Sequence, residues 1–278
     1  MGLCSGWRPS RNRGCSLEST DLGRDLELKD ATWANTGERL TATATLVSTL
    51  EPEAVEDLLR LFRTYFLVED PALFVRDLQN KDEVIRIWDP RGGLQGFSTL
   101  SSFRTTFQGR EMGVVYSGDT IISPDHWGTS VLPRAWLDTV IRISENLPRP
   151  LYWLLLSSGH KTYRLLTLFF REYYPSVERE APAHIRALMD QLGRERFGGQ
   201  YQEESGVVRF TRGATPLREG VSPLGLRELK SRHTAYFFSR NPGYVSGDEL
   251  LCLAEVADEN LTRAACRILR ALGRQRLP

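Results

Sequence analysis

The chain has 278 residues, with 36 basic and 35 acidic side chains and a formal net charge of +1. This balance argues against nucleic acids and other polyanions as partners, and the 41% hydrophobic content is typical of a soluble globular protein. No apolar run approaches the ~20 residues that a membrane-spanning helix needs, so no membrane-spanning segment is expected and contact with a membrane is not favoured.

Residues 1–28 are rich in Gly, Ser and Arg and have no apolar period, which predicts a flexible arm ahead of one domain over 29–278. The opening letters MGLCSG resemble an N-myristoylation signal, but Gly6 stands where that signal has Ser or Thr. The four cysteines are Cys4, Cys15, Cys252 and Cys266. They form no C-x-x-C pair and no secretory leader is evident, so a reducing, cytoplasmic location is expected.

The first half of the domain predicts a strand, two helices and three further strands. Alternation in ERLTATATLV indicates a strand over 38–47, and apolar residues at helical spacing indicate a helix over 52–66. Pro71 begins a second helix that ends near Gln79. Three antiparallel strands are then expected, over 83–89, 94–107 and 111–123.

A turn and a buried strand organise the second half. Pro124 and Gly128 mark the turn, and a helix is expected from Pro133 to about residue 146. PLYWLLLSS, at 150–158, is almost continuously apolar, which predicts a central strand buried on both faces. The remaining predictions are helices over 161–174, 181–198 and 259–275, and strands over 205–211, 234–240 and 248–256.

This order of elements resembles that of the GNAT N-acyltransferase superfamily over roughly residues 40–174. The segment IISPDHWGTSVLPRAWLDTVI is similar to the family pattern V-x-P-x-x-R-G-x-G-[IV]-G-x-x-L-L, and YWLLLSSGHKTYRLLTLFFREYYP to the strand and helix that follow it. The resemblance implies an α/β (α+β) fold, with a mixed and mostly antiparallel central sheet flanked by helices. This chain adds an inserted helix and a C-terminal helix. Two neighbouring parallel strands should splay apart and leave a cleft for a pantetheine arm.

In that family, backbone N–H groups in the turn bind the acyl-CoA pyrophosphate at a helix N-terminus. The resemblance assigns five residues to this site: Trp127, Gly128, Thr129, Ser130 and Arg134. Trp127, Ser130 and Leu132 replace the usual basic or amide residue and two small residues, so the motif is eroded. A second register would aim Asp125 at the diphosphate, which is electrostatically unfavourable. The alternative is that Thr129 or Ser130 only caps the helix.

Four side chains are candidates for proton transfer. His126 in the turn or Asp119 on the preceding strand would accept a proton from an attacking amine, directly or through water. The family's helix tyrosine, which protonates the leaving thiolate, aligns with Phe169, so Tyr163 or His160 is the substitute. The alternative for His126 and Asp119 is a structural role, as a hydrogen-bonded histidine and a bulge residue.

Other chemical groups are interpreted more simply. Cys252 falls in an apolar strand, which predicts a packed and inert thiol, and His160 and His184 lack neighbouring ligands, so no metal site is expected. Four loop residues could contribute to an acceptor pocket: Arg240, Asn241, Asp248 and Glu249.

The C-terminal helix has an arginine face, formed by Arg263, Arg267, Arg270 and Arg274. The apolar face opposite it contains Leu261, Ala265, Ile268 and Leu272. This pattern predicts a helix docked on the surface, whose basic side would suit an acidic acyl-carrier protein.

The sequence therefore favours an acyltransferase that moves an acyl group from a thioester to an amine or similar nucleophile of a small-molecule acceptor. The co-substrate would be acyl-CoA or the acyl-phosphopantetheine of an acyl-carrier protein, and no permanently bound cofactor is expected. The eroded motif favours an alternative, a catalytically silent GNAT-like module that binds a ligand or a protein. A third hypothesis is a peripheral membrane protein that uses the N-terminal arm and the basic C-terminal helix.

Overall fold

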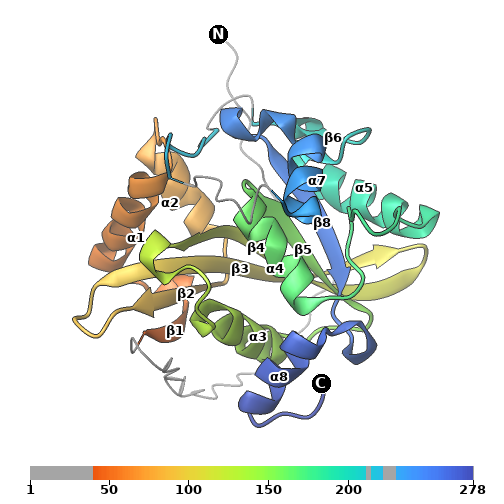
Figure 1. Cartoon of the computed structure of the whole chain (residues 1–278), viewed down its shortest axis with the longest axis horizontal. Coiled ribbons are helices and arrows are strands. Elements are labelled where there is room, and N and C mark those ends of the chain that lie inside the picture. Colours follow the sequence, from red (N-terminus) through yellow and green to blue (C-terminus); the bar gives the residue numbers. More distant parts are fainter. Residues whose placement is uncertain (1–39, 211–213, 222–229, 278) are drawn as a thin grey trace, which may run out of the picture.

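The computed structural model describes residues 40–210, 214–221 and 230–277 (Figure 1). The expected arm over 1–28, with its MGLC letters, lies outside these residues. Within them the strands form one eight-stranded sheet in the order β1-β2-β3-β4-β5-β8-β7-β6. Only β4 and β5 are parallel neighbours, and the other pairs of strands are antiparallel.

The strands are β1 (Thr41–Leu46), β2 (Glu83–Trp88), β3 (Leu94–Phe107), β4 (Arg110–Ile122), β5 (Leu151–Ser157), β6 (Tyr201–Gln202), β7 (Val207–Val208) and β8 (Glu249–Glu255). All seven residues of β5 are buried, and the strand lies in the middle of the sheet. The prediction of a central strand buried on both faces is therefore confirmed, as are the three successive antiparallel strands β2, β3 and β4. The strand expected over 205–211 is shorter than predicted.

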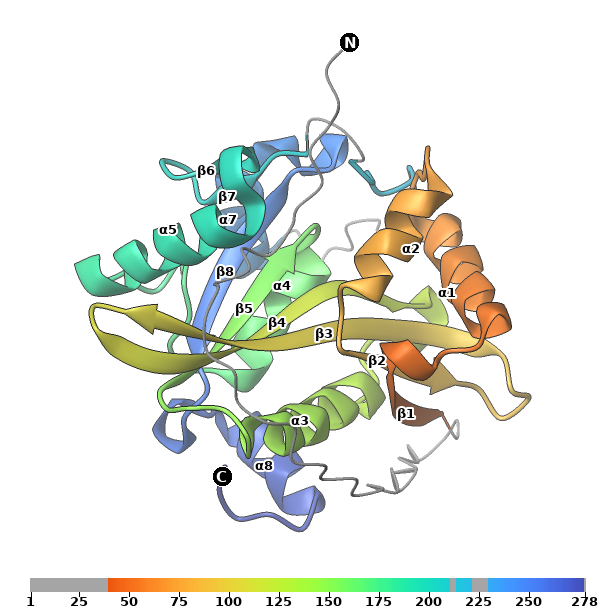
Figure 2. The same cartoon turned by 180° about the vertical axis from the view of Figure 1, so that it is seen from behind.

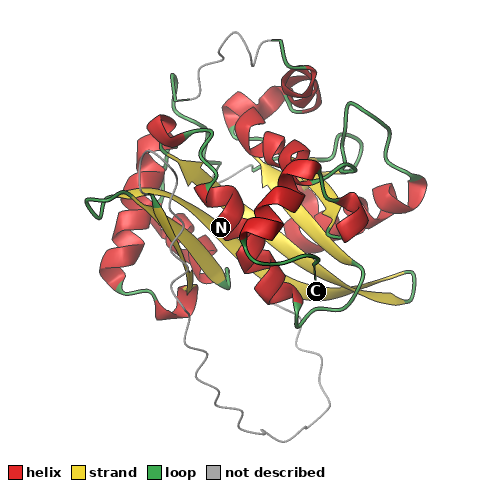
Figure 3. Ribbon diagram, turned by 60° about the horizontal axis from the view of Figure 1, so that its bottom comes forward, coloured by secondary structure: helices red, strands yellow, loops and turns green. Residues whose placement is uncertain are grey.

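The helices are α1 (Pro52–Tyr65), α2 (Pro71–Gln79), α3 (Val131–Ser144), α4 (His160–Phe169), α5 (Ala183–Phe197), α7 (Arg232–Arg240) and α8 (Arg263–Ala271). Figure 3 shows these helices in red around the yellow strands. None of the helices in the described residues combines the length and apolar character that crossing a membrane requires.

The helices divide between the two faces of the sheet. On one face α3, α4, α7 and α8 share a core with Val115, Trp153 and Leu155. On the other face, α1 and α2 pack at one end of the sheet and α5 packs over its other half. Both overall views show α1 and α2 on the opposite side of the molecule from α5 (Figures 1 and 2). The centre of that second face, near β4, therefore lies between two groups of helices.

The strand predicted over 234–240 is wrong, because residues 232–240 form helix α7. Ser231 caps this helix by accepting a hydrogen bond from the Thr234 N–H. Thr234 and Phe237, three residues apart, are buried. The capping residue and the burial at helical spacing outweigh the strand preference of the aromatic residues. The loop before β8 therefore joins a helix, rather than a strand, to β8.

Helix α4 ends at Phe169, five residues before the predicted end. At this point the chain forms hydrogen bonds with the segment around residue 260. Thr262 donates its N–H to the Phe169 carbonyl, and the Asn260 carbonyl accepts a hydrogen bond from the Arg171 N–H. Phe170 and Tyr174 then form isolated β-bridges with Leu261 and Leu253. These tertiary hydrogen bonds compete with the helix and end it.

Helix α8 confirms the expected docking. Ala265 and Leu269 are buried on its apolar side, whereas Arg263, Arg267 and Arg270 are exposed. The helix therefore covers the core and presents its arginines to solvent.

Candidate active site

Strands β4 and β5 separate partway along their length. Their parallel pairing runs from Gly113 and Leu151 to Ser117 and Leu155. Beyond Ser117, β4 remains paired with β3 as far as Ile122, and β5 remains paired with β8 to its end. Because each strand follows its outer neighbour, the sheet opens between them after Ser117.

A β-bulge lies next to this opening. Ser98 pairs with Thr120 and Leu100 pairs with Ser117, so two residues of β4, Gly118 and Asp119, stand opposite one residue of β3. A Cβ at the first bulge position, Gly118, would lie 2.8 Å from Lys81 Cε and 2.9 Å from Thr99 Oγ1, so a larger residue there would displace these two side chains. The bulge thus brings Asp119 beside the splay.

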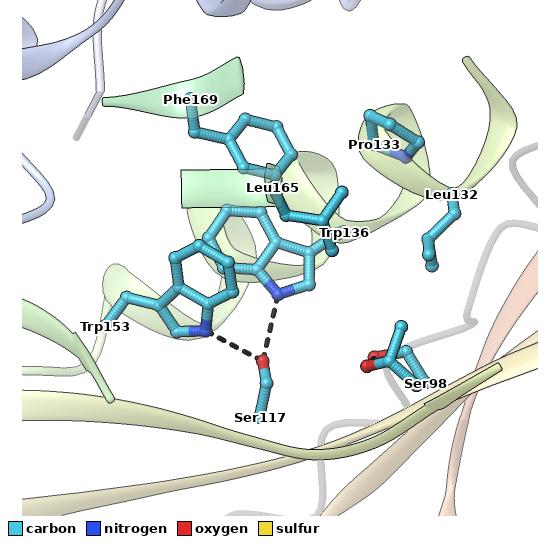
Figure 4. Close-up of a pocket in the computed structure, with 9 residues that line it drawn as sticks. Ser98, Ser117, Leu132, Pro133, Trp136, Trp153, Leu165 and Phe169 are labelled. Atoms are coloured by element: carbon cyan, nitrogen blue, oxygen red, sulfur yellow. Dashed lines mark hydrogen bonds between the residues drawn. The ribbon is translucent and has the colours of Figure 1, made fainter. Parts of the chain in front are cut away.

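An aromatic cluster, formed by Trp136, Trp153 and Phe169, fills the splay on the α3 and α4 side (Figure 4). The Trp136 ring lies 4.4 Å from the Trp153 ring and 4.7 Å from the Phe169 ring, between centroids. The cavity beside them has a volume of about 10 Å³. That volume admits roughly one water molecule.

Ser117 joins the two indoles of the aromatic cluster. Its Oγ accepts hydrogen bonds from Trp136 Nε1 at 3.1 Å and from Trp153 Nε1 at 2.9 Å, as Figure 4 shows. A hydroxyl can accept two hydrogen bonds and donate one, so the Ser117 O–H still has a proton to donate. Ser117 is buried and lines the cavity at the last paired position of the splay.

The opposite face of the sheet carries a charged cluster. It consists of Asp77 from α2, Lys81 just after α2, Tyr116 and Asp119 from β4, Arg196 from α5 and Glu249 from β8. The Tyr116 ring lies between two cations, with Arg196 Cζ at 4.5 Å and Lys81 Nζ at 5.5 Å from its centroid. Lys81 is buried, and its Nζ donates to Asp77 Oδ2 at 2.5 Å.

The two carboxyl groups beside the splay bind protons more tightly than usual. Burial raises the pKa of Asp119 to about 7, with a further rise from the charge of Asp77 and an opposing effect from Lys81. Burial also raises the pKa of Glu249 to about 8, and the charge of Asp119 adds to this rise. Like-charged carboxylates in a desolvated site resist simultaneous ionisation. Both carboxyl groups therefore titrate near neutral pH.

The turn after β4 keeps the hydrogen-bond donors of an anion site. Ser130 is the N-cap of α3, yet its side chain makes no capping hydrogen bond, so the alternative of a side-chain cap is wrong for this residue. The first N–H groups of a helix, here those of Val131 and Leu132, have no intrahelical acceptor. Thr129 Oγ1 and Arg134 Nε are buried without a hydrogen-bond partner. Gly128 has a φ of +84° and open space at its Cβ position.

Trp127 stands where the family pattern has a basic or amide residue. Its ring nevertheless lies against a cation that comes from another part of the chain. Its Nε1 donates to the Ile122 carbonyl at 2.9 Å, which fixes the indole. The Lys161 ammonium, from the first turn of α4, lies 3.7 Å from the centroid of that ring. Sequence reasoning missed Lys161, because the cation and the ring that binds it are 34 residues apart in the numbering.

The structure places the other candidates for proton transfer apart from the charged cluster. His126 ends the short 3-10 helix η2 (Pro124–His126) in the turn. His160 begins α4, is buried and packs its ring 5.6 Å from the Phe238 ring. Tyr163 is fully buried and donates to the Pro175 carbonyl at 2.8 Å. Phe169 lines the cavity and has no proton to donate.

Of the four loop residues, Glu249 alone belongs to the charged cluster. Asn241 donates to the Asp248 carbonyl at 2.8 Å, and Arg240 donates to the Ser205 carbonyl at 2.9 Å, so both connect backbone segments. Arg240 also lines a second cavity of about 160 Å³ next to α5. Cys252 is buried on β8, and burial raises the pKa of its thiol well above the usual range. Within the residues described, no three His, Cys, Asp or Glu side chains group as metal ligands would.

The decisive feature is a parallel pair that splays beside a bulge, with one helix following each of its strands. β4 leads through the turn into α3, and β5 leads directly into α4. Antiparallel strands extend the sheet on both sides of the pair, as the sequence resemblance implies. The fold is GNAT-like.

Comparisons with known proteins find solved structures that resemble this GNAT-like chain over part of its length. No protein-family model matches it, and no curated protein matches it. A probable N-acyltransferase from Enterococcus faecalis V583 superposes with a TM-score of 0.36 and 12% identity, over 48% of this chain and 33% of its own. The GNAT family N-acetyltransferase YhbS from Escherichia coli, in complex with CoA, gives a TM-score of 0.31 and 18% identity, over 42% of this chain and 63% of its own.

Arabidopsis thaliana NAA60, in complex with a bisubstrate analogue, gives a TM-score of 0.35 and 18% identity. That match covers 48% of this chain and 86% of the plant protein. The chain spans less than two thirds of the length of the Enterococcus and Escherichia proteins.

Proposed function

We propose that this chain is an acyltransferase that moves an acyl group from a thioester to the amine of a small molecule. One observation carries the proposal. The β-bulge places Asp119, whose pKa burial raises to about 7, beside the opening between β4 and β5. A carboxylate that titrates near the working pH is suited to accept a proton from an attacking ammonium group.

The donor would reach the splay from the N-terminus of α3. The unpaired N–H groups of its first turn, together with Arg134 and the Lys161 ammonium on Trp127, supply positive potential for a phosphate. A phosphopantetheine arm bound there would extend along β4 into the opening. The donor is an acyl-CoA or an acyl-phosphopantetheine on a carrier protein, which share this arm.

The chemistry would proceed by addition and elimination. Asp119 removes a proton from the ammonium form of the acceptor, and the free amine attacks the thioester carbonyl carbon. A backbone N–H of the splayed strand binds the oxyanion. Collapse breaks the C–S bond while the Ser117 O–H donates a hydrogen bond to the departing sulfur. The attacking nitrogen loses its second proton, which passes through water to the thiolate, so that a neutral amide and a free thiol leave, and Asp119 releases its proton to water.

The aromatic cluster favours a short acyl group. Trp136, Trp153 and Phe169 leave about 10 Å³ beside Ser117, which a long acyl chain could not enter without moving these rings. The same tight packing supports the second candidate function, a GNAT-like module that binds a ligand and catalyses nothing.

Donor binding and thiol release separate the two functions. The unfolding transition of the full chain is measured with acetyl-CoA, a long-chain acyl-CoA, desulfo-CoA and an acetylated acyl-carrier protein. A donor at 100 times its Kd should stabilise the fold by about 2.7 kcal/mol. Release of free thiol is then followed with a panel of amines.

Acyl transfer predicts binding of acetyl-CoA or of the acetylated carrier, and thiol release that depends on the amine. Binding without thiol release would support the silent module. No stabilisation by any of the four ligands would contradict the proposed acyltransferase.

A further inference from the structure

Arg196 is a cation that forms no direct ion pair with a described residue, although the charges of Asp77 and Asp82 act on it from a distance. Its guanidinium lies over two rings, 4.5 Å from the Tyr116 centroid and 4.7 Å from the Phe103 centroid. Among the residues that the structure describes, it makes no ion pair and no hydrogen bond, and burial lowers its pKa. Arg194 offers a contrast, since it is exposed and pairs with Glu203 at 2.8 Å. A stacked guanidinium with its edges unused is positioned to bind a planar anion.

Two buried hydroxyls on the same face of the sheet also lack partners. Thr99 is 1% exposed and Ser101 is 6% exposed, and neither Oγ atom has a hydrogen-bond partner. Ser101 pairs in register with Tyr116, and Thr99 Oγ1 faces the bulge next to Lys81. Buried polar groups in folded proteins are nearly always hydrogen-bonded. These hydroxyls are therefore a second, independent sign that this face receives a polar ligand.

Lys81 and Asp77 form an ion pair on this face, whereas three other charged residues of the cluster, Asp119, Arg196 and Glu249, are not paired with any described residue. Asp119 and Glu249 make no ion pair or hydrogen bond with any described residue, and both act electrostatically on the Tyr116 hydroxyl. The Arg196 charge acts on the same hydroxyl with the opposite sign. Carboxylates and a free guanidinium thus lie around one tyrosine without neutralising each other. A ligand with one positive and one negative group would satisfy both.

We propose that the acceptor is a small zwitterion, an amine that also carries a carboxylate, with the amine between Asp119 and Glu249 and the carboxylate on Arg196. This inference rests on the proposed function and adds the substrate class to it. A carboxylate fits better than a phosphate, because Asp77, Asp119 and Glu249 would repel a dianion more strongly than a monoanion. The hydroxyls of Thr99 and Ser101 would bind the ligand's polar groups between its two ends.

Binding to the full chain tests the inference independently of catalysis. Isothermal titration is carried out with the standard amino acids, with ω-amino acids, and with matched amines that lack the carboxylate: histamine, tyramine and cadaverine. The variants are Arg196→Gln and Arg196→Lys, with Arg194→Gln as the matched control on the same helix. Unfolding curves confirm that each variant is folded, and Arg196→Lys retains the charge if Arg196→Gln is unstable.

At least one amino acid should bind about tenfold or more tightly than its decarboxylated amine, because a charge-assisted pair is lost with the carboxylate. Arg196→Gln should remove that preference, Arg196→Lys should reduce it, and Arg194→Gln should leave it unchanged. Equal binding of amino acid and amine, an Arg196→Gln effect that is the same for both, or no binding of any amino acid would overturn the inference.

Thiol release from acetyl-CoA, measured with the same ligands, tests the proposed function separately. Amino-acid binding that depends on Arg196 without thiol release would overturn acyl transfer and leave the zwitterion site standing. Thiol release with amines that lack a carboxylate, and with no amino acid, would support acyl transfer and overturn the zwitterion site.

Discussion

At the residue scale, the raised pKa that suits Asp119 to act as a base also makes the stability of the fold depend on pH. An unfolded aspartate has a pKa of about 3.9, whereas burial raises the pKa of Asp119 to about 7. Between these values the folded state holds a proton that the unfolded state has released. The stability from this proton is fully present below the unfolded pKa and is lost as the pH rises through about 7.

Asp119→Asn should therefore make stability depend less on pH. The wild-type protein should lose stability from this carboxyl between about pH 4 and pH 7, and the variant should lose less over the same range. Urea unfolding at several pH values measures this difference. Asp125→Asn, at an exposed position of the turn, serves as the control and should follow the wild type. An identical pH slope for Asp119→Asn would show that its carboxyl is not perturbed.

Ser117 stabilises the aromatic cluster through its hydroxyl. Ser117→Ala would leave the N–H groups of Trp136 and Trp153 buried without an acceptor. An unsatisfied buried donor costs about 1–3 kcal/mol, so the variant should lose at least about 2 kcal/mol in urea unfolding. Ser239→Ala, at an exposed helix serine, should lose little. A loss for Ser117→Ala no larger than that of the control would contradict this role.

Single residues were predictable only where local sequence decided their place. Asp119 was chosen as a candidate base because it leads into a recognisable turn, and the burial of Cys252 was predicted because its neighbours are apolar. Lys81, Arg196 and Ser117 were missed, because their partners come from distant parts of the chain. Nothing near Arg196 in the sequence indicates that its guanidinium would lie on the ring of Tyr116.

At the scale of elements, a charged pair fixes α3 against the sheet. Arg142 on α3 donates to both carboxylate oxygens of Glu83 on β2, and Glu83 is buried. This contact holds the helix whose N-terminus forms the proposed phosphate site.

Arg142→Ala should destabilise the protein by about 2 kcal/mol or more, since it leaves the Glu83 carboxylate buried without its partner. Chemical denaturation measures the loss. Arg270→Ala, at an exposed position of α8, is the control and should change stability by less than about 0.5 kcal/mol. If both variants behave alike, the pair does not hold α3.

Elements with one strong signal were predicted well, and those with mixed signals were not. The continuous apolar run of β5 indicated only a buried strand, and the Pro-started segments of α1 and α2 indicated only helices. The segment TAYFFSR has strand-forming aromatics but also a capping serine before it, and the helix prevails because Phe237 packs between α4 and η4 (Pro242–Ser246). Such packing is not visible in a single sequence.

At the scale of the whole molecule, the sheet separates two environments. One face holds the aromatic cluster and the turn with its free N–H groups, and the other holds the charged cluster. The end of the pairing between β4 and β5 lies between these two environments. The order of elements was enough to predict this GNAT-like arrangement. It was not enough to predict which side chains fill the splay, because these come from α3, β5 and α4.

The central claim is that Asp119 acts as the base at this opening. The most direct test is the pH profile of kcat/KM for acyl transfer by the wild type and by Asp119→Asn, with Asp138→Asn on α3 as the control. The wild-type rate should rise through a midpoint near pH 7, and Asp119→Asn should lower it about 100-fold or more and remove that limb. An Asp119→Asn enzyme with the wild-type rate and the same profile would contradict the account.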